Sequence, residues 1–352
     1  MKLMKTTEKI WRGWLIATAF IASGCANEAP ALKGPEPASA AAVQNSPESA
    51  AADIPEYPAS MSEEARYPVT LHIGGTDVVI PDRPSRIAAL SLDAAEAVLE
   101  LSDPARVAVV TRSAADPSLA FNADKITGDI AQIAGATSLD PEKIMSYNSD
   151  LLIMTKGHEQ EKEAAEMLGQ AGIPLISLEV WNTFAKMEQN YAILGQALAE
   201  EQAAGRIIRE VNQKLETARQ AVADRPRPSV LVISPVGPGT GPFLIGSSNI
   251  SDDIVRQAGG NPLAESLSLG RSTKASMEAI LKADPDHIIL LQWKPGDDSD
   301  LRELTEAAGW SSLAAVQKGQ VHTMTVRQML YPNRYNADTV LELARLFHPD
   351  AF

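Results

Sequence analysis

Apolar and polar stretches alternate along most of the chain in a way that predicts strands and helices in turn. Short apolar runs typical of buried strands occupy positions 86–90, 107–110, 151–154, 173–178 and 230–234, and segments with helical spacing separate them. Strands that alternate with helices predict parallel sheets with right-handed crossovers. A β-hairpin is expected before the first of these strands, at 69–80, because Gly74-Gly75 suits the positive φ angles of a primed turn.

The pattern Glu-x-Ile-(Met/Leu)-x-x-x-x-Asp-x-(Leu/Ile)-Ile occurs twice with identical spacing. One copy runs from Glu142 to Ile153 and the other from Glu278 to Ile289, which places the two glutamates 136 positions apart. A repeat seen only twice, at so long a period, is not typical of a solenoid. It predicts two similar α/β lobes, and two lobes imply a cleft between them.

Helix starts are predicted from residues that cap helices. Asp93 is expected to cap a helix that runs to Leu101. Asp140 followed by Pro141 is a favourable start for the helix that holds the first repeat glutamate.

A long helical segment separates the two repeat copies. No proline occurs between Pro174 and Pro226, and the pattern is helical from 183 to 223. The stretch 200–223 alone would reach about 36 Å at ~1.5 Å per residue. Such a helix would be a stiff spine between two lobes. The alternative is two ordinary helices within the first lobe, with a break at Gly195 or Gly205.

The predicted fold class is α/β: two α/β lobes with parallel sheets, joined by one long helix, with the ligand cleft between the lobes. The expected divisions are a leader at 1–24, a flexible tether at 25–66, an N-terminal lobe at 67–182, a linking helical segment at 183–225 and a C-terminal lobe at 226–352. The tether is expected because its alanine-, proline-, glutamate- and serine-rich composition cannot bury a core.

The N-terminus has the organisation of an export signal. A basic region precedes an apolar run at 14–22, which is short for a membrane span, and Ser23-Gly24-Cys25 follows. Small residues before a cysteine resemble a bacterial lipobox, in which Cys25 would be lipidated, although Ala22 stands where leucine is usual. The alternative is an ordinary signal peptide. Because Cys25 is the only cysteine of the chain, lipidation is favoured and an intrachain disulfide is excluded.

The chain is acidic. Its formal net charge is −14, and it would be near −17 without residues 1–24. This balance argues against nucleic acid as a partner. The hydrophobic content of 45% is ordinary for a globular protein with substantial cores.

Several stretches resemble the iron-siderophore, haem and cobalamin substrate-binding proteins of ABC importers. They are Asp77–Ser91, Gly246–Asn249, Ala258–Pro262, both Glu-x-Ile repeats and the ending Leu343–Phe352. The resemblance covers about 68–352. It implies a monomeric, lipid-anchored protein on the extracytoplasmic face of a membrane, in a periplasm or on an outer surface. It also implies capture of an iron chelate, a ferric siderophore first and haem or cobalamin as alternatives, for delivery to a permease dimer with its ATPase. No resident cofactor is expected.

In this family one exposed glutamate of each lobe meets arginines of the permease. By motif position these residues are Glu142 and Glu278. The alternative is that each carboxylate only complements the dipole of its helix, which is worth about 0.3–1 kcal/mol.

The ligand is expected beyond the carboxyl ends of the strands, as in other open α/β sheets. Cationic side chains there would bind anionic siderophores or haem propionates, and aromatic ones would stack on a flat ligand. The candidates are Arg112, Lys156, His158, Trp181, Arg271, Trp293, Arg327, Tyr331 and Arg334. About half of the cationic residues are expected to be solvated loop residues instead. Each aromatic residue also suits a lobe core, and for Trp181 the core is at least as good an interpretation as the cleft.

His158 would be an axial ligand if the cargo were haem, with Tyr331 or Met329 opposite it. The alternative is a polar surface residue. Cobalamin is less favoured, because the loops 134–139 and 270–275 lack the aromatic residues that cobalamin binders often carry there. A bare-metal site is not expected, because the other four of the five histidines fall in predicted strands or at the C-terminus.

No catalytic motif is present: there is no Gly-x-Ser-x-Gly elbow, Walker loop or His-Glu-x-x-His. The protein is therefore not expected to be an enzyme, although a two-lobed cleft would suit one. A surface protein that only scavenges or senses a ligand is a further alternative.

Overall fold

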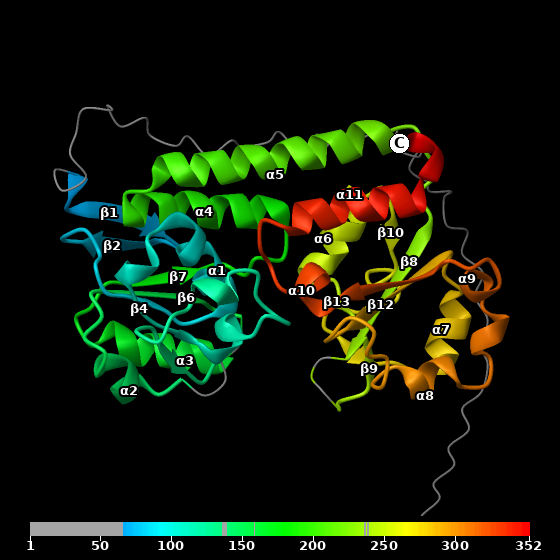
Figure 1. Ribbon diagram of the computed structural model, residues 1–352, viewed down its shortest axis with the longest axis horizontal. Coiled ribbons are helices and arrows are strands. Elements are labelled where there is room, and N and C mark those ends of the chain that lie inside the picture. Colours follow the sequence, from blue (N-terminus) through cyan, green and yellow to red (C-terminus); the bar gives the residue numbers. More distant parts are fainter. Residues whose placement is uncertain (1–65, 136–138, 158, 236, 238) are drawn as a thin grey trace, which may run out of the picture. The chain divides into compact units, whose positions relative to one another are not determined.

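The computed structural model describes residues 66–135, 139–157, 159–235, 237 and 239–352 (Figure 1). All of them belong to one compact unit, Ala51–Phe352. The expected leader, Cys25 and nearly all of the expected tether lie outside the described residues. Within the described ranges, no helix is both long and apolar enough to cross a membrane.

The first sheet is parallel throughout, and we refer to the part of the chain built on it as the N-terminal lobe. Its strand order is β5-β4-β3-β6-β7. The strands are β3 (Ile87–Ala89), β4 (Val107–Thr111), β5 (Ala131–Ile133), β6 (Leu151–Thr155) and β7 (Leu175–Leu178). One face packs on α2 (Pro141–Met145) and α3 (Glu159–Gly169), and the other on α1 (Leu92–Leu101) and α4 (Phe184–Leu198).

The second sheet is the centre of the C-terminal lobe and is mixed rather than purely parallel. Its order is β11-β9-β8-β12-β13, with β10 paired to β8. The strands are β8 (Ser229–Pro235), β9 (Pro242–Leu244), β10 (Asn261–Pro262), β11 (Thr273–Lys274), β12 (His287–Gln292) and β13 (Val321–Thr325). β9 runs antiparallel to β8 because the short connection between them is a hairpin and not a crossover.

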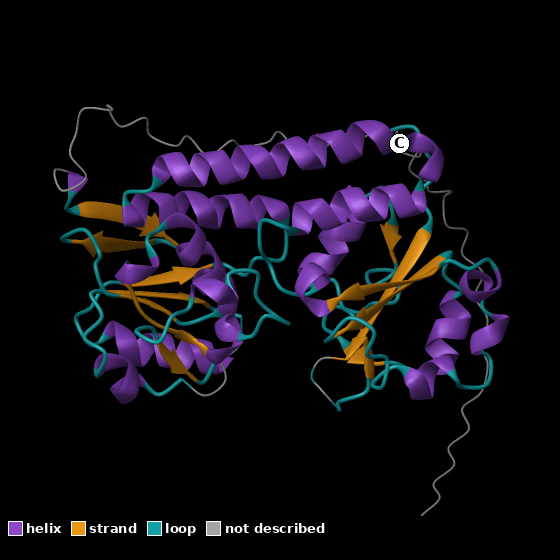
Figure 2. Ribbon diagram, in the orientation of Figure 1, coloured by secondary structure: helices purple, strands orange, loops and turns teal. Residues whose placement is uncertain are grey.

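Helices cover both faces of the second sheet, as Figure 2 shows for the whole unit. One face packs on α6 (Ile250–Gln257), α10 (Val326–Met329) and α11 (Asn336–Phe347), and the other on α7 (Met277–Ala283), α8 (Arg302–Thr305) and α9 (Ala314–Gln317). Short 3₁₀ turns occur at Pro104–Arg106, Arg112–Ala115, Ala123–Lys125, Trp310–Ser312 and Pro349–Ala351. The predicted hairpin is confirmed as β1 (Val69–Ile73) and β2 (Thr76–Ile80), with positive φ at both turn glycines.

The lobes are joined by α4 and the longer helix α5 (Glu201–Val222). The break between them falls at Ala199, whose φ is 57°, and not at Gly195 or Gly205, the two positions that the alternative of two helices had named. Gly195 lies inside α4, where a Cβ atom would come within 2.7 Å of the Ala204 side chain. The glycine thus permits the two helices to approach closely.

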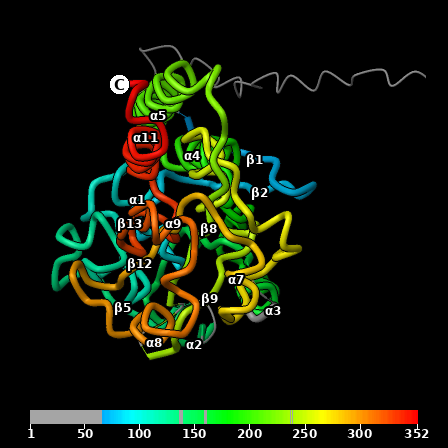
Figure 3. The backbone as a smooth tube through the Cα atoms, turned by 90° about the vertical axis from the view of Figure 1, so that its right-hand side faces the viewer, coloured from blue at the N-terminus to red at the C-terminus, as the bar shows by residue number. Residues whose placement is uncertain are grey.

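α5 contacts helices of both lobes, which is what the predicted spine requires. Its buried residues recur every three or four positions, from Ala204 to Val222. This apolar stripe packs on α4 of the N-terminal lobe and on α11 of the C-terminal lobe. Figure 3 shows α5 and α11 one above the other at the end of the unit farthest from α2.

Candidate functional site

A cavity of about 330 Å³ lies at the carboxyl edge of the first sheet, and residues of the C-terminal lobe border its other side. In parallel sheets this edge is where side chains from successive strand ends meet. The N-terminal lobe contributes Ser91, Leu92, Asp93, Thr111, Ser113, Leu119, Gly135, Thr155, Gly157, Glu161, Val180, Trp181 and Asn182. The C-terminal lobe contributes Ser248, Asn249, Ile250, Leu330, Tyr331 and Pro332.

Hydrogen bonds between neighbouring strand ends hold this wall together. The Ser91 hydroxyl donates to Asp93 at 2.5 Å and accepts from the Thr155 backbone amide at 3.2 Å. The Trp181 indole N–H donates to the Thr155 hydroxyl at 3.0 Å. The ends of β3 and β6 and the segment after β7 therefore form one preorganised surface with several hydroxyl groups.

Asp93 faces the cavity from the first turn of α1. The prediction that it caps this helix is wrong: the N-cap is Ser91, and Asp93 accepts from Ala94 N, its own neighbour, at 2.8 Å. Burial raises the pKa of the Asp93 carboxyl; hydrogen bonds from Ser91 and Ala94 oppose this rise, and the Glu161 carboxylate adds to it.

Glu161 is the second carboxylate in the wall. It is 5% exposed and accepts from the Gly157 backbone amide at 2.5 Å. No sequence pattern marked Glu161 as a site residue, because it lies in the charged stretch at 159–163, which is typical of a solvated helix face. Its burial follows from the start of α3 at the carboxyl edge of the sheet.

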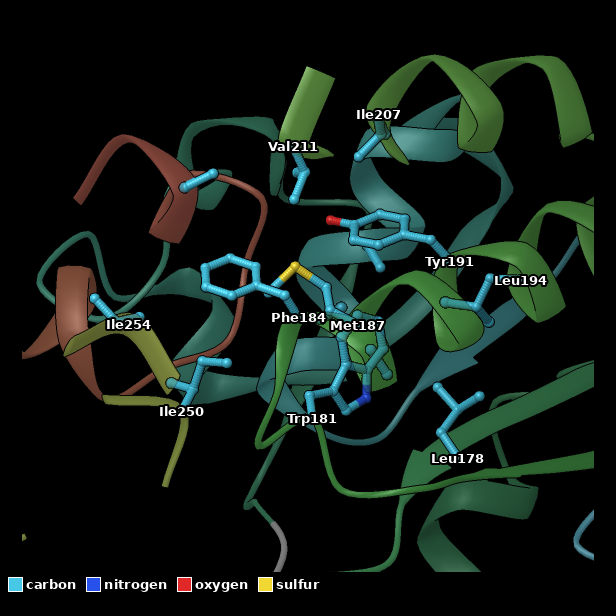
Figure 4. Close-up of a cluster of buried hydrophobic side chains, with 14 of the residues drawn as sticks. Leu178, Trp181, Phe184, Met187, Tyr191, Leu194, Ile207, Val211, Ile250 and Ile254 are labelled. Carbon is cyan, nitrogen blue, oxygen red and sulfur yellow. The ribbon is translucent and has the colours of Figure 1, made fainter. Parts of the chain in front are cut away.

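Two of the predicted aromatic residues lie in the cavity wall. Trp181 is 1% exposed and makes an edge-to-face contact with Tyr191, with 5.6 Å between the ring centres. Figure 4 shows it in a cluster with Phe184 and Met187, so most of its ring belongs to the core. Tyr331 comes from the opposite lobe. Burial, with a smaller effect of Asp116, raises the pKa of its phenol to about 12.

Arg327 is held by the N-terminal lobe instead of facing the cavity. Its Nη1 donates to the carbonyl of Pro117 at 2.8 Å, and its guanidinium lies 4.2 Å from the ring centre of Phe121. Arg334 pairs with Glu210 of α5 at 3.0 Å and with Glu100 of α1 at 3.4 Å. Both arginines therefore connect the C-terminal lobe to other parts of the unit.

The remaining candidates lie outside the cavity wall or outside the described residues. Arg112, Lys156 and Arg271 are exposed, and Trp293 is half-buried against the core. None of these four is among the described residues that line the cavity. His158 is not described.

The polar residues that sequence reasoning missed as site residues share one property, a position at a strand end or a helix start. Asn249 caps α6 by accepting from Ser251 N at 3.1 Å and also borders the cavity. Asn182 directly follows Trp181. The strand-end rule applies to Asn182, whereas the signal for Asn249 was its position directly before a helix, where asparagine is a favoured cap. Among the described residues, no cluster of three or more His, Cys, Asp and Glu side chains is arranged to hold a metal ion.

The two repeat glutamates are exposed in the first turns of short helices. Glu142 follows the Asp140 cap, which accepts from Lys143 N at 3.2 Å as predicted. Glu278 follows Ser276, whose hydroxyl accepts from Ala279 N at 3.2 Å. The isoleucines two positions after each glutamate are buried in the lobe cores, at 1% and 0% exposure, so each helix is fixed to its lobe with the carboxylate facing outward.

Comparison with known proteins finds relatives of similar length and fold. An uncharacterized ABC transporter substrate-binding lipoprotein of Bacillus subtilis, YvrC, is 21% identical over 99% of both chains. Among solved structures, the periplasmic heme-binding protein RhuT from Roseiflexus has a TM-score of 0.63 at 21% identity, covering 76% of this chain and 99% of that one.

Two other solved structures have comparable scores. An ABC-type Fe³⁺-hydroxamate transport protein from Saccharomonospora viridis has a TM-score of 0.62 at 19% identity, covering 80% of this chain and 99% of that one. A Helicobacter pylori CeuE complex with Ni-His has a TM-score of 0.62 at 16% identity, covering 81% and 89%. The sequence model of one family matches residues 87–327, which span both sheets, and the chain therefore belongs to the periplasmic binding protein family.

Proposed function

We propose that this protein is the substrate-binding lipoprotein of an ABC importer, and that it captures a ferric siderophore for delivery to a membrane permease. The observation that carries the proposal is the cavity of about 330 Å³ between the carboxyl edge of the first sheet and the C-terminal lobe. Ligand pockets in proteins have volumes of roughly 300–1,000 Å³. The names of the relatives support the importer role, since one is an ABC transporter lipoprotein and another an Fe³⁺-hydroxamate transport protein.

The cavity wall favours a siderophore over haem. Haem iron takes axial ligands from the protein, whereas a siderophore surrounds its own iron. Of the described residues that line the cavity, none is histidine or methionine. Met329, which was named with Tyr331 as a residue opposite His158 if the cargo were haem, is fully buried. Tyr331 remains as a phenol ligand for haem, and for that reason haem stays the second candidate.

Docking on the permease is proposed for Glu142 and Glu278. Each is exposed and lies at the same position of the repeat in its lobe. Three residues further on, each helix carries an exposed apolar side chain, Met145 at 45% and Leu281 at 40%. Two outward carboxylates beside two apolar side chains suit a partner surface with arginines. The partner would be a permease dimer with its ATPase, and the binding protein itself a monomer.

Membrane attachment is proposed through Cys25, after removal of a leader at 1–24 and followed by a tether at 25–66. The support is the lipobox-like sequence and the lipoprotein name of the Bacillus subtilis relative. The protein would face away from the cytoplasm. The lobe divisions at 67–182, 183–225 and 226–352 belong to the same proposal.

A binding role is proposed in preference to catalysis, and no resident cofactor is included. In the described part of the cavity wall, the Ser91 hydroxyl donates a hydrogen bond to the Asp93 carboxyl. A nucleophile would need a base to accept its proton and a third group to orient that base. Histidine is the usual base and does not occur among the described lining residues.

Fluorescence titration of the full chain in mild detergent tests the proposal. Ferric hydroxamate, catecholate and carboxylate siderophores, haem and cobalamin would be added in turn. Because Trp181 borders the cavity, a bound ferric complex should quench its emission, with a dissociation constant of about 1 µM or lower. The quench should shrink in Trp181→Phe. Binding of haem or cobalamin alone, or of nothing in the panel, would overturn the siderophore assignment.

A further inference from the structure

We infer that the cleft selects iron complexes with a net positive charge and discriminates against anionic ones. The inference rests on the proposed function and specifies the substrate class of the same cavity. It reverses the sequence-based expectation that arginines and lysines in the cleft bind an anionic siderophore or haem propionates.

The ionisable groups of the wall are the first observation. Among the described residues that line the cavity, the charged types are Asp93 and Glu161, and lysine and arginine do not occur. The other polar lining residues are hydroxyl and amide side chains, which are neutral. The undescribed residues next to the lining in sequence are Ala136, Thr137, Ser138 and His158, and none of these is a permanent cation.

The positions of the predicted cations are the second observation. Arg327 is engaged by the Pro117 carbonyl and the Phe121 ring, and Arg334 by Glu100 and Glu210. To bind a ligand, either guanidinium would have to break these contacts. The exposed Arg112, Lys156 and Arg271 are not part of the wall.

The surroundings of Asp93 are the third observation. The groups that act on its carboxyl are the hydroxyls of Ser91 and Thr155, the Ala94 amide and the Glu161 carboxylate. None of these groups is positively charged, and burial with a like charge nearby disfavours a carboxylate. A positive group on the ligand would relieve this unfavourable environment, whereas a negative group would add to it.

Among the described residues, those that form the opposite wall add no positive charge. Tyr331 is neutral at physiological pH because its pKa is about 12, and the carboxylate that acts on it is Asp116. A ligand in the cavity would therefore meet carboxylates at α1 and α3 and a neutral phenol across from them. The best fit is an iron complex with a pendant ammonium group or a cationic coordination sphere.

A charge series on one ferric trihydroxamate scaffold tests this inference. The cationic member is ferrioxamine B, the neutral member its N-acetyl derivative and the anionic member its N-succinyl derivative. The iron coordination is the same in all three. We expect the dissociation constant to rise about tenfold for each unit of positive charge removed from the ligand. This is the order of magnitude of the Coulomb interaction between two unit charges roughly 10 Å apart at an effective dielectric constant of about 20. The full chain in mild detergent would be titrated at low and high salt.

Isosteric variants locate the effect. Asp93→Asn and Glu161→Gln should each bring the cationic and anionic members about tenfold closer in affinity. Glu303→Gln, which removes one exposed carboxylate of α8, should leave the series unchanged. Thermal unfolding of each variant checks that it is folded. If a variant does not fold, the salt dependence of the series in the unaltered protein decides, since salt should weaken the cationic member and strengthen the anionic one.

The outcomes separate the inference from the proposed function. Equal affinities across the series, or tightest binding of the anionic member, would overturn the inference and leave the siderophore assignment standing. Binding of an anionic catecholate or of haem in preference to all three would overturn the inference as well. Binding of no iron complex at all would overturn both.

Discussion

Asp286 accepts hydrogen bonds from both the backbone amide and the hydroxyl of Ser229, at 2.9 and 2.7 Å. In the other lobe Asp150 accepts from the amide and hydroxyl of Ser85, at 2.7 and 2.8 Å. Each of the two is the aspartate of its copy of the sequence repeat. Each lies at the start of one strand and holds the start of the neighbouring parallel strand. The repeated aspartate therefore fixes strand register at the edge of the sheet that is opposite the cleft.

Replacement of Asp286 by alanine should lower stability without affecting ligand binding. The two accepted hydrogen bonds are exposed, so the expected loss is about 1 kcal/mol in the free energy of unfolding. Hydrogen bonds from Ser229 lower the pKa of Asp286 in the folded protein. The stability that Asp286 contributes is therefore fully present above the pKa that its carboxyl has in the unfolded chain, and it is lost as pH falls through the lower pKa of the folded state. Urea unfolding at pH 7 measures the loss, and Glu303→Ala is the control. A wild-type midpoint for Asp286→Ala would contradict the assigned role.

Acidification should destabilise the C-terminal lobe through His287. Burial lowers its pKa to about 4, with a further effect of His322, whose ring nitrogen lies 3.2 Å away. Between pH ~6.5 and ~4 the folded state then binds fewer protons than the unfolded state, so the free energy of unfolding decreases as pH falls through this window. For the one proton of His287 the decrease is at most about 1.4 kcal/mol for each pH unit. The titratable and charged groups that face His287 are Asp286, His322, His348 and Lys318.

Urea midpoints of the wild type and His287→Gln, measured at intervals from pH 7 to pH 4, test this expectation. The variant should show a shallower fall, because it lacks one titrating group. Buried carboxyls such as Glu96, whose pKa is raised by burial, act in the opposite direction, but they are common to both proteins and cancel in the difference. Parallel curves would show that His287 does not titrate in this window.

The hydrophobic periodicity of the sequence predicted most of the fold. The hairpin, both repeat units and the long linking helix follow from local pattern, because hydrophobic spacing and caps depend on near neighbours in sequence. The break at Ala199 was missed, because its left-handed φ occurs at an alanine and not at a glycine, the residue that usually marks such a helix end. The antiparallel strands β9 and β11 are too short to give a pattern.

The cavity wall was predicted less well than the fold. Position at a strand end identified Trp181 and Tyr331, since a parallel sheet collects such residues at one edge. The same rule selected Arg327, whose side chain instead binds a carbonyl 210 positions earlier in the chain. Which way a long side chain turns depends on acceptors in the other lobe, and a sequence pattern carries no information about them.

Removal of the Arg327 side chain should loosen the contact between lobes. In Arg327→Ala the carbonyls of Pro117 and Ala120 lose their donor and Phe121 loses its stacked cation. We expect a loss of about 1–2 kcal/mol in the free energy of unfolding. Arg327→Lys should not restore it, because an ammonium lacks the planar donor geometry. Faster hydrogen exchange at 117–121 is the direct readout. The control is Arg345→Ala, which removes a guanidinium that lies 5.1 Å from the ring centre of Phe352. Equal exchange rates at 117–121 in both variants would refute the interlobe role of Arg327.

Reversal of charge at Glu142 and Glu278 should block delivery while binding is retained. Both carboxylates are exposed, so each substitution should change stability by no more than about 1 kcal/mol through the helix dipole. Uptake of radioactive ferric chelate by cells carrying Glu142→Arg or Glu278→Arg should fall at least about tenfold if each glutamate pairs with a permease arginine, because an Arg–Arg contact replaces attraction by repulsion. Affinity for the chelate in solution should be unchanged, since neither residue lines the cavity.

Met145→Ser and Leu281→Ser, which remove only the adjacent apolar groups, should give smaller losses of uptake. Normal uptake with both charge reversals combined would leave the two glutamates as helix-dipole residues, and the permease would then have to recognise another face of the lobes.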